Sequence, residues 1–342
     1  LTCWGRVPTP HDRPGHRAEP VLAAHRGWVI GSLWAVIEPL KHYGRGFLMG
    51  CADIVPGVSG GTIALILGIY RAFIGNLRKG ASTLKAWLKG DLSGGWAVFA
   101  SIEWLFIVPL GAGAATAFLL LRHPMEDLLI ERPEGVAAVF SGLVVASCIL
   151  VWRGISQRDG LRFAVVAGVA LLAFWLLGFQ SGAANNPGLL AFFATGAIAI
   201  CAMILPGISG SFIMLMLGMY AAVLGGEVGQ LAVFAVGAIV GLAIFSSILN
   251  WILEHHEQTL MAALLGLMIG SIRVLWPWPN GVGVIGESSE ETVRGTDLAW
   301  PATGELAGGV ALAVVAAVAT LVIVRFAEAT PTVVDEQLSK TL

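Results

Sequence analysis

Two stretches of this chain carry the same chemical feature, a Pro-Gly-x-Ser-Gly sequence inside a strongly apolar segment. The first copy is ADIVPGVSGGTIALILGIY, from Ala52 to Tyr70, and the second is AMILPGISGSFIMLMLGMY, from Ala202 to Tyr220. Aligned from Cys51 and Cys201, the copies match at 12 of 20 positions. The chain therefore contains an internal repeat, and interrupted hydrophobic segments at corresponding positions of two halves indicate a transporter's binding site.

The interruption provides groups that can bind an anion. A helix that ends at Pro-Gly leaves carbonyl groups unpaired, and the helix that starts after Ser-Gly presents unpaired N–H groups carrying about half a positive charge. Hydroxyl groups add donors, and glycines let a phosphate or carboxylate approach the backbone. We predict helix breaks at Pro56 and Pro206. The predicted phosphate-binding residues are Gly57, Ser59, Gly60, Gly61, Thr62, Gly207, Ser209, Gly210 and Ser211. The alternative is that each break only kinks a membrane helix for packing.

Three charged residues are candidates for roles beside the breaks. Asp53 precedes the first break where Met203 stands in the second copy, and it is either a proton or cation carrier or a cap of the following half-helix. Glu103 falls inside a predicted span and is a second candidate for coupling or gating. Arg273 replaces the apolar Ile149 of the other half, so it binds the ligand's negative charge or extends to the outer headgroups.

Composition places the chain in a membrane. The sequence is 56% hydrophobic and 12% charged, whereas soluble domains have about 25% charged residues. It contains neither a phosphate-binding loop of the ATPase type nor an H-E-x-x-H motif, and its four cysteines form no C-x-x-C pair. We therefore expect no enzyme activity, no metal, no cofactor and no nucleic-acid partner.

Apolar runs predict six spanning helices, each of about 17 to 25 residues. The predicted spans are 96–121, 136–152, 161–179, 231–253, 260–276 and 306–326. We expect a disordered basic cytoplasmic tail over 1–27, an interfacial helix over 28–43, a long acidic outer loop over 277–305 and a cytoplasmic tail over 327–342. Both termini are then cytoplasmic.

The two interrupted segments are predicted to enter and leave the bilayer on the same side. Lys and Arg flank the first copy on both ends, which the positive-inside rule assigns to the cytoplasm, while the flanks of the second copy lack them. Three intervening spans reverse the side of entry. We predict an all-α integral membrane protein with an inverted repeat, each half being one re-entrant hairpin plus three spans. The halves are 44–188, with hairpin 44–75, and 189–326, with hairpin 189–225.

The two interrupted segments, together with the GSIRVLWPW stretch from Gly270, closely resemble the bacterial polyprenyl-phosphate (undecaprenyl-phosphate) transporter family, once known as a domain of unknown function. The resemblance extends from about Gly44 to Phe326. It implies a translocase in the bacterial cytoplasmic membrane that returns undecaprenyl phosphate to the cytoplasmic leaflet for cell-wall synthesis. The resemblance also implies which residues of this chain match the family's functional positions: Asp53, Pro56, Gly57, Ser59, Gly60, Gly61, Thr62, Pro206, Gly207, Ser209, Gly210 and Ser211.

Residues and resemblance converge on a lipid phosphate, because anion sites inside a hydrophobic protein suit a phosphate head whose tail stays in the bilayer. The expected partners are a polyprenyl-phosphate lipid and a coupling proton or sodium ion. A transporter of a small anion or organic acid is the alternative. A polyprenyl diphosphate phosphatase is more remote, because no compact His/Arg/Lys cluster is present, and a structural scaffold leaves both breaks unexplained.

Overall fold

The computed structural model describes residues 37–54, 59–179, 186–278, 298–301 and 304–329. These residues form helices and their connections, without a strand among them. The predicted basic tail, most of the outer loop and most of the C-terminal tail lie outside the described residues, as do Pro56 and Gly57. The all-α prediction is confirmed.

A helix over residues 37–53, called here the N-terminal helix, comes first. It runs unbroken past residue 43, where the sequence suggested a boundary between an interfacial helix and the hairpin. The helices that follow are α2 (Gly60–Ile66), α3 (Tyr70–Leu88), α4 (Leu92–Ala100), α5 (Trp104–Glu131), α6 (Pro133–Gly154), α7 (Gly160–Leu176), α8 (Leu189–Ile204), α9 (Gly210–Met216), α10 (Tyr220–Leu224), α11 (Val228–His255), α12 (Glu257–Ser271) and α13 (Glu305–Ala329).

Within the part of the chain that the structure describes, four helices are long and apolar enough to cross a bilayer, namely α5, α6, α11 and α13. The other two predicted spans, 161–179 and 260–276, are represented by α7 with 17 residues and α12 with 15 residues. Predicted span 96–121 is divided, because residues 101–103 interrupt the helix between α4 and α5. The chain is thus a multi-pass membrane protein in which some apolar helices are short.

The apolar helices pack in pairs, two of which take one helix from each half of the chain. α8 packs along α11, α7 along α12, and α6 along α13. The N-terminal helix packs on α5 through Gly46, where a Cβ atom would collide with the carbonyl oxygen of Leu110. Gly196 lies 150 positions later and makes the same kind of backbone contact, with the carbonyl oxygen of Phe234 in α11. Small residues at helix interfaces permit this close approach in membranes.

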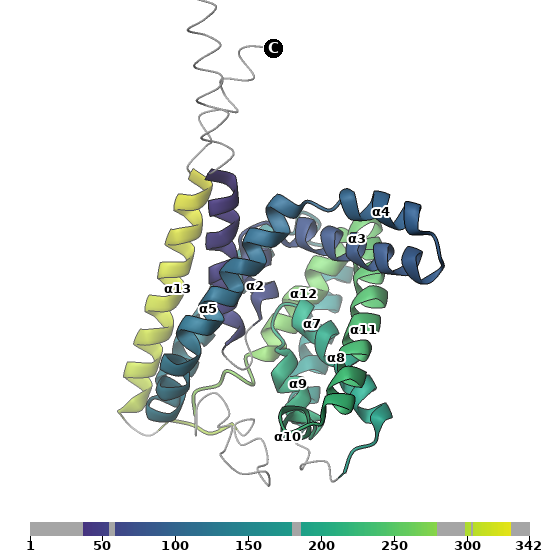
Figure 1. Cartoon of the computed structure of the whole chain (residues 1–342). Helices are drawn as coiled ribbons and strands as arrows, with labels where there is room; N and C mark the ends of the chain where they lie inside the picture. The colour runs from purple at the N-terminus through teal and green to yellow at the C-terminus, as the bar shows by residue number, and fades with distance from the viewer. Residues whose placement is uncertain (1–36, 55–58, 180–185, 279–297, 302–303, 330–342) are drawn as a thin grey trace, which may run out of the picture.

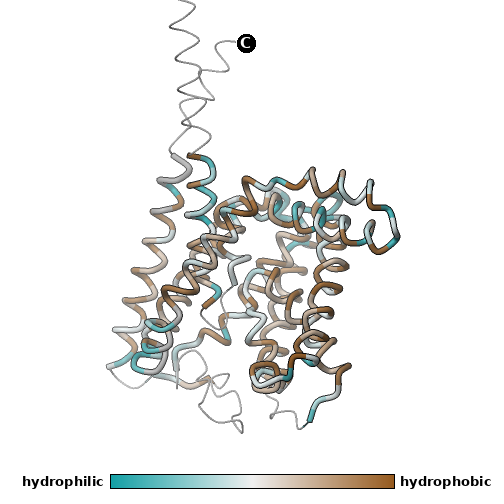
Figure 2. The backbone as a smooth tube through the Cα atoms, viewed as in Figure 1, coloured by the Kyte–Doolittle hydropathy of each residue, from teal (hydrophilic) through white to brown (hydrophobic). Residues whose placement is uncertain are grey.

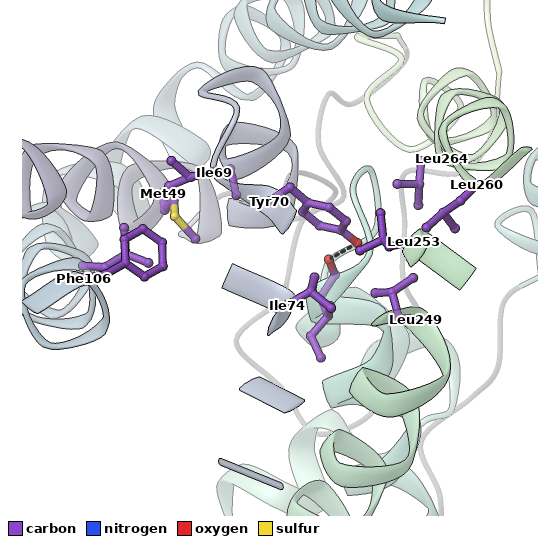
Figure 3. Packing of buried hydrophobic residues seen from close by; sticks show 12 residues of the cluster. Met49, Ile69, Tyr70, Ile74, Phe106, Leu249, Leu253, Leu260 and Leu264 are labelled. Carbon is purple, nitrogen blue, oxygen red and sulfur yellow. Dashed lines mark hydrogen bonds between the residues drawn. The ribbon is translucent and has the colours of Figure 1, made fainter. Parts of the chain in front are cut away.

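One apolar cluster joins the two halves near the breaks. It includes Tyr70 and Ile74 of α3, Leu249 of α11, and Leu264 of α12, all nearly inaccessible to solvent. Figure 3 shows Tyr70 and Ile74 facing the leucines of α11 and α12 across this cluster. The cluster fixes the start of α3 against the second half of the chain.

Helices α3 and α4 lie side by side across one end of the molecule, at the top of Figure 1. Figure 2 shows that α3 mixes hydrophilic and hydrophobic residues, while the long helices below it are mainly hydrophobic. Amphipathic helices of this kind lie in the membrane interface. This end of the molecule therefore carries the polar flank that follows the first break.

Candidate functional site

The first break is closed by its own polar groups. Ser59 is the N-cap of α2, and its Oγ accepts a hydrogen bond from the N–H of Gly61 at 3.0 Å. The carboxylate of Asp53, at the end of the N-terminal helix, accepts from the N–H of Gly60 at 2.6 Å. The N–H of Thr62 donates to the carbonyl oxygen of Ser59. All three leading N–H groups of α2 therefore have protein acceptors.

The second break is built differently. Ser209 precedes α9, yet its side chain makes no capping hydrogen bond, and its hydroxyl pairs instead with that of Ser211 at 2.7 Å. Among the described residues, no protein group accepts from the N–H groups of Gly210, Ser211 or Phe212. The start of α9 keeps its partial positive charge without a protein partner.

Direct hydrogen bonds join the two breaks, which lie about 150 residues apart in sequence. Thr62 is fully buried, and its hydroxyl accepts from the N–H of Gly207 at 3.0 Å. The hydroxyl of Ser59 donates to the carbonyl oxygen of Met203 at 2.9 Å. Gly61 faces Ile204, where a Cβ atom would lie 2.6 Å from the carbonyl oxygen. The structure thus brings Ser59 and Thr62 of the first copy against Gly207 and the end of α8 in the second copy.

Gly207 holds a backbone conformation that side chains disfavour. Its φ is +90°, in the region that L residues with a Cβ atom rarely adopt. A Cβ atom there would also lie 2.9 Å from the Cα atom of Met268 in α12. Both observations require glycine after Pro206, which is itself buried.

Asp53 occupies the place that a ligand anion would take at α2. Its carboxylate lies against the first turn of the helix, so that a Cβ atom on Gly60 would be 2.6 Å from its Oδ2. A negative group at a helix N-terminus is stabilising. The capping arrangement that the sequence left open is therefore present, and a role in coupling stays a prediction.

Arg273 lies just beyond the C-terminal end of α12. Its guanidinium carbon is 4.8 Å from the ring centroid of Phe174, and its buried Nε has no hydrogen-bond partner among the described residues. Ser271, two residues earlier, lies close to the second break, because a Cβ atom on Gly207 would be 3.1 Å from its Oγ. No hydrogen bond or ion pair joins Arg273 to either break within the described residues, and its predicted phosphate contact stays a prediction.

Glu103 does not lie within a spanning helix, contrary to the position expected from the apolar run. It is the N-cap residue of α5, and its half-exposed carboxylate pairs with Nζ of Lys79 at 3.0 Å. Its N–H donates to the side chain of buried Asn76. The interruption at residues 101–103 explains the difference, since it places this residue at a helix end.

Tyr70 belongs to the site although its chemistry was not singled out from the sequence. Its hydroxyl donates to the carbonyl oxygen of Ile204 at 3.3 Å, the contact drawn as a dashed line in Figure 3. The available signal was the repeat itself, because tyrosine closes both copies, at Tyr70 and Tyr220. This hydroxyl satisfies a carbonyl group that the end of α8 leaves without a helical partner.

Comparison with known proteins gives consistent matches. Residues 49–293 match the model of a family described as VCA0040-like, undecaprenyl phosphate translocase-like. A polyprenyl-phosphate transporter of Vibrio cholerae is 39% identical over 259 residues, covering 74% of this chain and 83% of that protein. A polyprenyl-phosphate transporter of Staphylococcus aureus is 29% identical over 256 residues, covering 68% of this chain and 84% of that protein. No solved structure shows a significant match.

Proposed function

Because the chain belongs to the undecaprenyl phosphate translocase-like family, a family of transporters rather than enzymes, we propose that it moves undecaprenyl phosphate across the bacterial cytoplasmic membrane. The phosphate binds at the joined breaks while the polyprenyl chain stays in the bilayer. Returning the lipid to the cytoplasmic leaflet makes it available again as a carrier in cell-wall synthesis.

The observation that carries this proposal is the contact between the two breaks. Thr62 bonds to Gly207 and Ser59 bonds to Met203, so the start of α2 lies against the end of α8 and the turn that leads into α9. Unpaired N–H groups and hydroxyls at a helix start bind phosphate oxygens. The start of α9, whose leading N–H groups have no protein acceptor among the described residues, is the favoured first position of the phosphate, with Ser209 and Ser211 as additional donors.

We further propose that the two halves form an inverted repeat of re-entrant hairpins. The N-terminal helix packs on α5 as α8 packs on α11, and α6 packs on α13 as α12 packs on α7. Contacts repeated in this way support a two-fold relation between the halves. Irregular backbone at membrane depth is tolerated where it is surrounded by protein or lines a cavity.

Coupling is proposed to depend on Asp53. Its carboxylate competes with the lipid phosphate for the start of α2, since both are anions and the N–H of Gly60 already donates to it. Uptake of a proton or sodium ion by this carboxylate weakens its hold and frees the helix start. Exchange of the phosphate between the two breaks is thereby linked to an ion gradient.

A leaflet-resolved transport assay tests the function. Purified protein is reconstituted in vesicles with a fluorescent polyprenyl phosphate, and the label in the outer leaflet is quenched over time. We expect protein-dependent movement that unlabelled polyprenyl phosphate inhibits and inorganic phosphate or a dicarboxylate does not. Protein-dependent uptake of radiolabelled phosphate or dicarboxylate into the same vesicles, with no lipid movement, would instead identify a small-anion transporter.

A further inference from the structure

A groove between α3 and α11 has positively charged residues on one side and an apolar wall on the other. Its volume is about 820 Å³. α3 contributes Arg78 and Lys85, Lys89 follows directly as its C-cap residue, and α11 contributes apolar residues on the neighbouring wall. The groove lies where α3 crosses the end of α11, at the upper right of Figure 1. It is separate from the joined breaks.

Two of the three basic residues of the groove have no acidic partner among the described residues. Arg78 pairs with Glu254 at 3.2 Å, but the exposed side chains of Lys85 and Lys89 have no ion-pair partner among the described residues. These two lysines are four residues apart, in the last turn of α3 and at its C-cap, where like charges repel. An anion bound between them would remove that repulsion.

The apolar wall consists of large side chains that the protein leaves uncovered. Val240, Ile244 and Ile248 follow one stripe of α11 and are 37%, 58% and 49% exposed. Trp251 extends the stripe by about one turn and is 53% exposed. From Val240 to Trp251 the stripe runs roughly 17 Å along the helix axis, which is long enough for several isoprene units of an extended chain.

We propose that this groove binds polyprenyl phosphate before or after the lipid reaches the breaks, an inference that rests on the proposed function. A phosphate monoester carries about −1.5 to −2 charges near neutral pH, which matches two unpaired lysines, whereas a phosphodiester headgroup brings one. A single polyprenyl chain follows the one stripe of α11. Lys85 is about 22 Å along α3 from Tyr70, which touches the second break, so the groove is a docking position and not the translocation site.

Photo-crosslinking tests the inference. The wild-type protein in vesicles is labelled with polyprenyl phosphate carrying a photoreactive group on the chain, and labelled peptides are identified by mass spectrometry. We expect labelling on α3 and α11. In Lys85→Gln with Lys89→Gln this labelling should fall about tenfold, the effect of losing two exposed charge contacts. The control, Arg153→Gln with Arg158→Gln, removes two charges outside the groove, and labelling on α3 and α11 should be retained.

A second variant tests the apolar part without changing charge. Ala243 lines the groove and is half-buried. Ala243→Phe should therefore fill part of the groove and reduce labelling, while the circular dichroism spectrum stays unchanged. Unlabelled polyprenyl phosphate should compete for the groove. Equal competition by phosphatidylglycerol would show a site for bulk anionic lipid and overturn the proposal.

The groove and the translocation function can fail separately. Transport by the wild type, combined with labelling that ignores both groove variants, would overturn the docking site and leave the function intact. Groove labelling with the expected losses but no transport would support the docking site and refute the translocase.

Discussion

The hydrogen bond from Gly207 to Thr62 gives the sharpest test of whether the two breaks are held together. Thr62→Val keeps the shape of the side chain and removes the hydroxyl that accepts from this buried N–H. An unsatisfied buried donor costs about 1–3 kcal/mol, so we expect that loss in the free energy of unfolding. Thr62→Ser retains the hydroxyl and should keep the hydrogen bond.

Amide hydrogen exchange reports this bond directly. In Thr62→Val the amide of Gly207 should exchange about 5- to 150-fold faster, the equivalent of 1–3 kcal/mol, while Thr62→Ser should resemble the wild type. Thr116→Val is the matched control, because the hydroxyl of half-buried Thr116 donates to the carbonyl oxygen of Ala112 in its own helix. Unchanged Gly207 exchange in Thr62→Val, or equal loss of stability in Thr116→Val, would refute the reasoning.

Three further predictions concern topology, binding and coupling. In a cysteine-free background, Leu92→Cys should be shielded from an impermeant external reagent while Gly188→Cys reacts, and labelling of both from one side would contradict the inverted repeat. Ser59→Ala with Ser209→Ala should weaken polyprenyl-phosphate binding at least tenfold, measured by lipid titration of folded protein, since hydrogen bonds to charged groups contribute about 1.5–3 kcal/mol each. Asp53→Asn should abolish gradient-driven transport but retain phosphate-lipid binding, and normal transport with the wild-type pH dependence would leave Asp53 as a cap only.

The sequence predicted two helix breaks with similar polar residues because the repeat places one chemical pattern at two positions. It could not predict how each break is satisfied. Ser59 and Ser209 are equivalent in sequence, yet one caps its helix and the other pairs with Ser211. The difference depends on neighbours such as Met203, whose carbonyl oxygen orients the hydroxyl of Ser59. Such contacts arise only when both halves are packed together.

Helix lengths were less predictable than helix positions. Hydropathy treats residues 96–121 as one run, but Trp104 starts a new helix after residues 101–103. Asn76 fixes this point by accepting the N–H of Glu103, and Lys79 pairs with the Glu103 carboxylate. These partners come from α3, so no pattern within the run itself could reveal the interruption.

The unequal breaks imply an order of events. A carboxylate of the protein occupies the start of α2, whereas the start of α9 has Met203 at the position equivalent to Asp53 and no acceptor among the described residues. A lipid phosphate can therefore bind at α9 without displacing a protein anion. In the mechanism we propose, its passage to α2 requires the Asp53 carboxylate to leave or lose its charge, because two anions cannot share one helix start. We infer that the asymmetry between otherwise repeated segments makes movement of the phosphate depend on ion binding at Asp53.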